Sequence, residues 1–394
     1  MHGFDEPLDR RESNSLKWNH GRRLLPPAQA AADPLPMWVA DMDFRVAAPV
    51  ADALRREIDQ GVLGYGGTPA SYLEAVVGWQ ERRFGWRADA DWIVRTPGVI
   101  SALNVAIQAF TLPGDHVLVQ PPIYHHFLTD VVANGRRLAL APIPCDAQGR
   151  YWFDPERFEA SIQPGTRLFM LCNPHNPTGN VWSAEDLLAM ASICQKHGVL
   201  VVSDEIHQDL VFNRSARHLP FGMLDHPAAA DSVVCTAPTK TFNIAGLQCA
   251  NIFIPNPRLR QMFRTQLERN GNAHPNILGT AACEAAYRKG EAWVDAMLAY
   301  VRENQLHFAS RIREVSLQMQ VTPTDALYLA WIDCRNMGLA PSALFDFFAR
   351  QARLWLDPGT KFGNAGEGFM RINLACSRSL VDEALLRLQR ALTE

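Results

Sequence analysis

Several features that would narrow the function of a protein are missing from this sequence. No apolar run is long enough to span a bilayer, and the charged start of the chain contains no signal-peptide core, so we predict a cytoplasmic protein. The 8 cysteines form no C-x-x-C pair, which predicts buried free thiols and no metal site. A formal net charge of only -3 excludes a global attraction to nucleic acid or to an anionic membrane.

The composition is that of an ordinary globular protein. Of its 394 residues, 47% are hydrophobic and 20% are charged. This length allows two or three domains with a large core. Because the net charge is small, an anionic ligand must be bound by local groups.

The middle of the chain alternates between predicted strands and helices. Helical patterns cover residues 100–110, 124–134 and 184–197. Candidate strands cover residues 92–95, 116–120, 137–141, 168–172, 199–203, 232–235 and 250–254. Several of these strands are apolar throughout, as is typical of parallel strands covered on both faces. The pattern predicts an α/β fold with an open, mostly parallel sheet that binds ligands at the carboxyl ends of its strands.

The two ends of the chain differ from this middle part. The first 45 residues are rich in proline and charge, which predicts an extended arm before helices at 49–60 and 69–84. The pattern after Pro255 predicts a smaller α+β unit. Its helices are predicted at 258–270, 275–289, 291–319, 342–353 and 380–392, and its strands at 326–332 and 368–374.

Lys240 is the first candidate functional residue. It follows the apolar run 232–235 and precedes the small-residue turn 243–246, so we expect it where a buried strand ends in a loop. Burial lowers the pKa of an ammonium group and allows the amine to form a Schiff base and to transfer protons. A solvated surface lysine is the alternative on residue type alone.

Two polar residues follow other predicted strands. Asp204 ends the strand at 199–203, where a carboxylate faces the ligand crevice and keeps a heteroaromatic nitrogen protonated. A helix cap or a surface acid is the alternative. Asn176 lies in the sequence NPHNPTG, whose Asn-Pro and Thr-Gly steps predict a rigid turn. Its amide can donate to a phenolate-like oxygen, unless the turn is only a connection.

A phosphate site is predicted at the start of the helix at 100–110. Gly98 precedes this helix, and the amides of Val99 and Ile100 are its first free donors. A plain strand-to-helix turn has the same sequence pattern.

Four further residues each have two interpretations. Tyr124 either stacks on a planar cofactor or packs in the core. Tyr65, in a glycine-rich loop, either donates to a phosphate or anchors the loop. His207 either orients a cofactor oxygen or packs beside Asp204. Arg371 interrupts an apolar strand and needs a carboxylate partner, either internal or from a substrate, and we favour the substrate.

Six motifs resemble the class I/II aminotransferase family, fold type I enzymes that use pyridoxal 5′-phosphate. In chain order they are GVI, PPIY, NPHNPTG, SDEIH, TKTFNIAG and MRINLACSR, and together they span almost the whole chain. The resemblance implies that Lys240 binds the cofactor covalently, that Asp204 pairs with its pyridine nitrogen and that Asn176 contacts its phenolic oxygen. It also implies that Arg371 binds the α-carboxylate of an amino acid, and that Tyr65 reaches a phosphate across the interface of a homodimer.

Three sequences resemble the cystathionine β-lyase (carbon–sulfur lyase, MalY/PatB) branch of this family: PMWVADMDF, KTFNIAGLQ and DEIH. The first of them places Trp38 among the implied substrate-binding residues. Two positions depart from the wider family, because Gln248 replaces an arginine that faces the cofactor phosphate and His207 replaces a tyrosine. The phosphate must then depend more on helix amides and on hydroxyl groups such as that of Thr239.

The resemblance also implies a domain organisation and a reaction. The organisation is an N-terminal arm (1–45), a large cofactor-binding domain (46–288) and a small C-terminal domain (289–394) that packs with the arm. The reaction is a β-elimination on a sulfur-containing L-amino acid that gives a thiol, pyruvate and ammonia. An aminotransferase is the alternative, and an added regulatory role through a protein partner is a third possibility.

Overall fold

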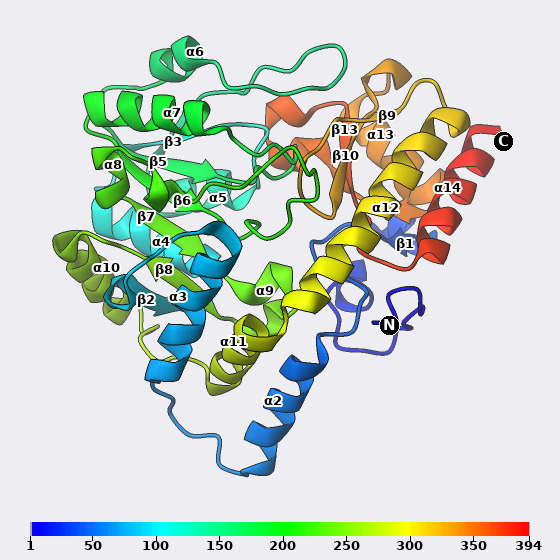
Figure 1. The fold of residues 1–394 in the computed structure, drawn as a ribbon. Helices are drawn as coiled ribbons and strands as arrows, with labels where there is room; N and C mark the ends of the chain where they lie inside the picture. Colours follow the sequence, from blue (N-terminus) through cyan, green and yellow to red (C-terminus); the bar gives the residue numbers. More distant parts are fainter. Residues whose placement is uncertain (1, 394) are drawn as a thin grey trace.

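A seven-stranded sheet forms the centre of the larger half of the computed structural model, which describes residues 2–393 (Figure 1). In spatial order its strands are β2 (Ile93–Thr96), β8 (Ala250–Phe253), β7 (Val233–Thr236), β6 (Leu200–Asp204), β5 (Thr166–Cys172), β3 (His116–Val119) and β4 (Arg137–Leu140). Strand β8 runs antiparallel to both neighbours, and the other pairs are parallel. The predicted strands and the mostly parallel sheet are therefore confirmed.

Both faces of this sheet are apolar and covered by helices. In β5, Phe169 and Leu171 belong to one hydrophobic core, whereas Leu168 and Met170 belong to the core on the other face. One face is covered by α4 (Val99–Phe110), α5 (His126–Ala133) and α10 (Pro257–Arg269). The other is covered by α3 (Ala70–Phe84), α6 (Pro155–Ala160), α7 (Ala184–Lys196), α8 (Pro227–Ala230) and α11 (Ile277–Lys289). This arrangement explains why several of the strand sequences are apolar throughout.

A four-stranded antiparallel sheet forms the smaller half. Its order is β12 (Asp357–Pro358), β13 (Phe369–Asn373), β10 (Leu329–Asp333) and β9 (Gln320–Val321), and α13 (Pro341–Asp346) and α14 (Arg378–Thr393) pack against it. The helix predicted at 342–353 continues after α13 as a π-helical turn over Phe347–Gln351. A smaller unit is present, as the change in pattern predicts, but its expected start after Pro255 is wrong, because α10 and α11 pack against the large sheet.

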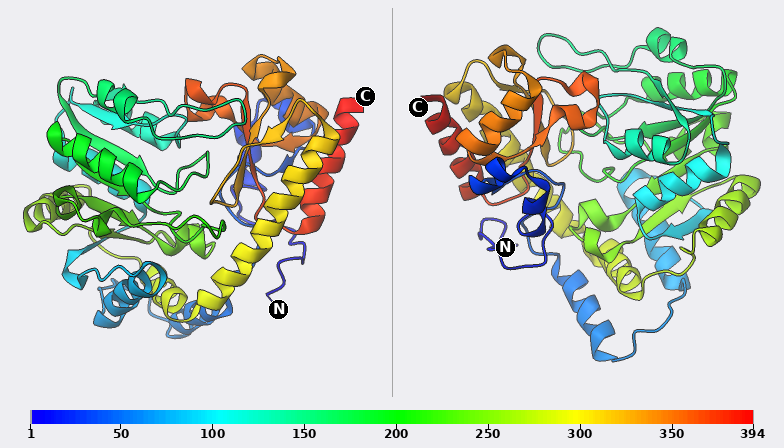
Figure 2. Two further views of the ribbon diagram at one scale, coloured as in Figure 1. Left: turned by 45° about the horizontal axis from the view of Figure 1, so that its top comes forward. Right: turned by 180° about the vertical axis from the view of Figure 1, so that it is seen from behind.

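Helix α12 (Glu291–Val315) runs diagonally from one half to the other, as Figure 2 shows. Trp293 and Met297 pack in the core of the large sheet, whereas Phe308 and Ile312 pack in that of the small sheet. The helix ends four residues earlier than the predicted range 291–319, because Ser316 is extended. None of the helices among residues 2–393 is both long and apolar enough to cross a membrane.

The prediction of an extended arm for the first 45 residues is partly wrong. The chain forms a 3-10 turn at His20–Leu24 and a short helix α1 (Pro27–Ala31), which begins with a proline that needs no amide partner. Strand β1 (Leu35–Pro36) then pairs in parallel with β11 (Leu354–Trp355) of the smaller half. The start of the chain therefore packs beside the C-terminal part, before α2 (Ala48–Asp59) returns to the larger half.

The turn that follows β5 ties the two halves together through Gly179. Its carbonyl accepts the amides of Asp325 and Ala326, both at 3.1 Å, from the segment before β10. Gly179 has a φ of +75°, and a Cβ there would lie 1.8 Å from the hydroxyl of Thr324 and 2.9 Å from the carbonyl oxygen of Ala326. Glycine is therefore required at this position both for its conformation and for space.

We predict that Gly179→Ala lowers the free energy of unfolding by about 2–5 kcal/mol, because left-handed backbone strain and overpacking add together. Gly198→Ala is the matched control, since Gly198 has a φ of +65° but nothing lies within 4 Å of a Cβ there. It should cost only about 1–2 kcal/mol. Urea denaturation of both variants measures the difference, and equal losses would show that the contact with Thr324 and Ala326 is irrelevant.

Candidate active site

Lys240 lies just after a buried strand, as the sequence predicts, but in a helical turn rather than in a loop. The turn is α9 (Pro238–Thr241), which follows β7 directly and begins with Pro238. The amine of Lys240 donates to the carbonyl oxygen of Ala40 at 2.8 Å. Burial lowers its pKa to about 8, with Asp41 acting in the opposite direction. A substantial fraction of neutral amine, the nucleophilic form, is therefore present near neutral pH.

Asp204 is the last residue of β6, at the carboxyl end of the sheet as predicted. Its side chain is 4% exposed and accepts the amide of Ile206 at 3.1 Å. Burial raises its pKa to about 7, although the hydrogen bond from Ile206 lowers it. The carboxylate forms no ion pair within residues 2–393, so a cationic group from a ligand would stabilise it.

Asn176 and Arg371 meet between the two halves of the molecule. Arg371 lies in the centre of β13 and donates from Nη1 to the side-chain oxygen of Asn176 at 2.9 Å. Its Nη2 donates to the carbonyl oxygen of Trp38 at 3.2 Å and to the carboxylate of Asp357. We favoured a substrate as the carboxylate partner of Arg371, but the structure supplies an internal one, because β12 places Asp357 opposite Arg371.

The start of α4 supplies backbone donors to the same region. Gly98 precedes the helix, and the amides of Val99 and Ile100 lie in its first turn, where no intrahelical acceptor is available. Gly98, Val99 and Ile100 all line the cavity described below, so the start of the helix faces open space. The arrangement can bind an anion.

Two ring side chains border the site. Burial raises the pKa of Tyr124 to about 12, so its hydroxyl stays protonated. Burial lowers the pKa of His207 to about 3, with further contributions from Lys240 and Arg371, which keeps the imidazole neutral. Nδ1 of His207 is buried without a hydrogen-bond partner among residues 2–393. That nitrogen is available to a ligand.

A single cavity of about 730 Å³ brings almost all the predicted residues together. The predicted residues that line it are Trp38, Gly98, Val99, Ile100, Tyr124, Asn176, Asp204, His207, Thr239, Lys240, Gln248 and Arg371. Tyr65 is the exception: it is 93% exposed, in the segment between α2 and α3. The roles assigned to these residues stay predictions, whereas their proximity is a property of the structure.

The sequence reasoning missed four residues with imidazole, carboxylate or amine side chains that also line the cavity: His125, His126, Asp357 and Lys361. Lys361 pairs with Asp357 at 2.8 Å, and His126 pairs with Asp130 at 2.9 Å. The sequence DPGTKF contains a signal for the first pair, because an acid and a lysine four residues apart flank a turn just before the strand of Arg371. The double histidine after Tyr124 carried no comparable signal.

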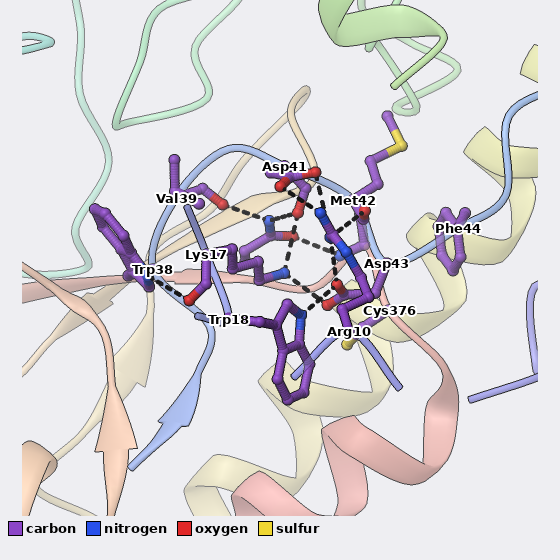
Figure 3. A network of polar contacts seen from close by, with 12 residues as sticks. Arg10, Lys17, Trp18, Trp38, Val39, Asp41, Met42, Asp43, Phe44 and Cys376 are labelled. Carbon is purple, nitrogen blue, oxygen red and sulfur yellow. Dashed lines mark hydrogen bonds and ion pairs between the residues drawn. The ribbon is translucent and has the colours of Figure 1, made fainter. Parts of the chain in front are cut away.

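The segment Trp38–Phe44 closes one side of the site and is held by a charge network, shown in Figure 3. Asp43 accepts from Lys17 at 2.7 Å, from Arg10 at 2.8 Å and from the indole of Trp18 at 2.8 Å. Lys17 also donates to the carbonyl oxygen of Asp41. Both Lys17 and Asp43 are buried, so the network fixes the backbone that presents Ala40 to Lys240.

We predict that Asp204→Asn stabilises the cofactor-free protein at pH 8 but hardly at pH 4. The pKa of Asp204 is about 7 when folded against 3.8 as a free side chain, so its ionisation costs stability as the pH rises through this interval. The full cost is about 4 kcal/mol at most, since each pKa unit is about 1.4 kcal/mol. Urea denaturation at the two pH values measures the gain.

Asp333→Asn is a control for which we expect a change in stability of the opposite sign. Burial acts to raise the pKa of Asp333, but its hydrogen bonds with Arg335 outweigh this and lower the pKa, so its charge stabilises the fold. That variant should lose stability at pH 8. An equal effect of Asp204→Asn at both pH values would contradict the prediction.

Comparisons with known proteins support this arrangement. The family model of aminotransferase class I and II matches residues 38–388. Cystathionine beta-lyase PatB of Bacillus subtilis is 41% identical over 99% of this chain and 100% of its own. Cystalysin of Treponema denticola, whose crystal structure contains a pyridoxal 5′-phosphate cofactor, has a TM-score of 0.94 at 31% identity and matches 100% of this chain and 99% of its own.

A third similar protein is the PLP-bound C-S lyase of Staphylococcus hominis. Its structure has a TM-score of 0.90 at 29% identity and covers 99% of this chain and 98% of its own. The family model and the relatives extend over nearly the full length of the sequence. The chain therefore belongs to the class I and II aminotransferase family.

Proposed function

We propose that the protein is a pyridoxal 5′-phosphate-dependent carbon–sulfur β-lyase. It converts a sulfur-containing L-amino acid such as cystathionine and water into a thiol, pyruvate and ammonia. The observation that carries this proposal is the single cavity in which Lys240, Asp204, Asn176 and Arg371 meet. Similarity to proteins described as cystathionine beta-lyase and C-S lyase supports the choice of reaction.

The residues of the cavity fit the cofactor. The buried carboxylate of Asp204 has no cationic partner within residues 2–393 and suits a protonated pyridine nitrogen. Nδ1 of His207 is a buried group free to pair with a cofactor oxygen. The amides of Val99 and Ile100 would bind the phosphate, with the hydroxyl of Thr239 as a further donor.

The reaction depends mainly on the guanidinium of Arg371 and the amine of Lys240. When bound, the cofactor withdraws electrons from the α-carbon of the amino acid. The guanidinium of Arg371 binds the α-carboxylate and fixes the α-carbon near Lys240. The neutral amine of Lys240 takes the α-proton, and the carbonyl oxygen of Ala40, 2.8 Å away, holds the resulting ammonium group. Trp38 lines the cavity beside Arg371 and bounds the space for the sulfur substituent.

An aminotransferase is the second candidate, because the family model describes that activity. Both reactions begin with removal of the α-proton by the amine of Lys240. They differ in the bond that breaks next. In the lyase the carbon–sulfur bond breaks and the thiolate leaves, whereas in the transferase the amino group is passed to a 2-oxo acid.

We predict that the holoenzyme forms pyruvate, ammonia and homocysteine from L-cystathionine over many turnovers without an added 2-oxo acid. Lys240→Ala should lower kcat by at least about 1000-fold, because it removes the base and the covalent anchor. Lys196→Ala, which alters a lysine side chain that is 67% exposed, is the matched control and should leave kcat unchanged. Turnover only after addition of a 2-oxo acid would reject the lyase in favour of the aminotransferase.

We further propose that the protein is a homodimer in which Tyr65 donates to the cofactor phosphate of the partner. In Figure 1, the end of α2 and the segment that follows it lie at the lower edge of the molecule. Three apolar side chains in this segment are exposed, namely Val62 (79%), Leu63 (59%) and Tyr65 (93%). An apolar segment of this kind is stabilised by burial against another chain. Cytoplasmic location and a regulatory protein partner stay predictions from the sequence.

We predict that sedimentation shows a dimer for the native protein and a larger monomer fraction for Val62→Ser/Leu63→Ser. Leu317→Ser is the control, because Leu317 is even more exposed, at 93%, but lies in the other half of the chain. Tyr65→Phe should remain dimeric but bind pyridoxal 5′-phosphate about tenfold more weakly, since it loses one hydrogen bond to a charged group. A native monomer, or unchanged affinity in Tyr65→Phe, would contradict this model.

A further inference from the structure

Arg371 already has a carboxylate partner before any substrate binds. Asp357 and Arg371 are direct neighbours on the antiparallel strands β12 and β13, and their side chains form an ion pair. Both residues are buried, at 2% and 3% exposed. The proposed function requires the same guanidinium to bind the carboxylate of an amino acid. The two carboxylates therefore compete for one group.

Arg371 is held in place by more contacts than Asp357. Arg371 lies in β13 between two other strands, its Nη1 is bonded to Asn176, and its guanidinium lies 4.8 Å from the ring of Phe362. Asp357 lies in a strand of 2 residues at the edge of the sheet. Its other oxygen accepts from Lys361, which is 30% exposed. Asp357 is the partner that can move.

Arg371 and Lys361 have an unbalanced positive charge and an unused hydrogen-bond donor, both of which a second carboxylate could satisfy. Arg371 and Lys361 carry two positive charges and share the single negative charge of Asp357. Nε of Arg371 is buried and has no hydrogen-bond partner among residues 2–393. Because Nη1 is bonded to Asn176, a carboxylate can form two parallel hydrogen bonds with this arginine through Nε and the adjacent Nη2, which Asp357 now occupies. A bound ligand would thus displace Asp357 from Nη2 and balance the remaining charge.

We propose that Asp357 is a resident counter-ion that the substrate carboxylate displaces from Arg371, and that Lys361 retains Asp357 after the exchange. Asp357 and Lys361 then determine specificity, because only a ligand with a carboxylate can compete with Asp357 and complete the pairing of Arg371. The proposal rests on the proposed function in one respect, namely that the ligand of Arg371 is the carboxylate of an amino acid.

Titration of the holoenzyme with propionate by calorimetry tests the exchange without turnover. We expect Asp357→Asn to bind propionate about tenfold more tightly, because the competing charge is removed while the side-chain shape is kept. Lys361→Gln should bind propionate several-fold more weakly, because Asp357 then pairs with Arg371 alone. When Asp357→Asn is already present, adding Lys361→Gln should change the propionate affinity much less than it does in the native protein. A double-mutant cycle measures this difference.

Two controls accompany the titration. Propionamide has the same shape without the charge, and its affinity should not change in any variant. Asp333→Asn removes the acid of another ion pair in the small sheet, with Arg335 at 2.7 Å, and should leave propionate binding unchanged. Asp357→Ser, with thermal melting to confirm that it is folded, provides a second test if Asp357→Asn is unstable.

Propionate affinity that is unchanged or weaker in Asp357→Asn would overturn the proposal and make Asp357 a fixed partner that orients Arg371. An equal gain for propionamide would also overturn it, because the effect would not depend on charge. The test is separate from that of the reaction. If the protein releases no pyruvate from cystathionine but shows the predicted propionate response, the exchange at Arg371 is supported. Only the assignment as a lyase is then rejected.

Discussion

Burial of ionisable groups in one cavity is the constraint on which the rest of the structure depends. An unpaired charge inside a protein is costly, so each group must be paired, neutralised or left for a ligand. Arg371 is paired with Asp357, and the amine of Lys240 is brought towards neutrality by burial. Asp204 is buried and forms no ion pair among residues 2–393, although the charge of Lys240 acts to lower its pKa. In the proposed function, a cationic ring nitrogen beside Asp204 would supply the missing positive charge.

The N-terminal arm completes this cavity from a distant part of the sequence. Ala40, whose carbonyl oxygen accepts from Lys240, is 200 positions away from it in the chain. The side chain of Asn373, in the small sheet, donates to the carbonyl oxygens of Val39 and Asp41 on either side of Ala40. The segment around Ala40 is thus held from the small sheet as well as by the Asp43 network. The proposed catalysis by Lys240 would therefore depend on contacts that also stabilise the fold.

Local signals explain what could be predicted from the sequence. Apolar runs identified all the strands of the large sheet, and the rule that ligands bind at the carboxyl ends of strands placed Asp204 and Lys240 correctly. The partner of Arg371 could not be predicted in this way. Its pairing with Asp357 depends on the register between β13 and a strand of 2 residues, which is too short to produce a periodic pattern.

The same limit applies to the arm. Strand β1 is only 2 residues long and pairs with β11, more than 300 positions away, so no local pattern indicates the pairing. The short helix α1 was missed because the prolines around it suggested an extended chain. Tyr65 shows a further limit, since a residue proposed to act in a partner chain cannot be placed near the cavity by any analysis of one chain.

Gln248 connects the charge of the cavity with the proposed assembly. It lines the cavity in a left-handed conformation with a φ of 48°. The resemblance of the sequence implies that many aminotransferases carry an arginine at this position. Without that guanidinium, the proposed phosphate site depends on neutral donors and on the partial positive charge of the start of α4, which is about half a unit. Such a site attracts a phosphate less strongly than one with an arginine. In the proposed homodimer, the hydroxyl group of Tyr65 from the partner subunit would then account for a larger share of the binding energy, which would couple retention of the cofactor to dimer formation.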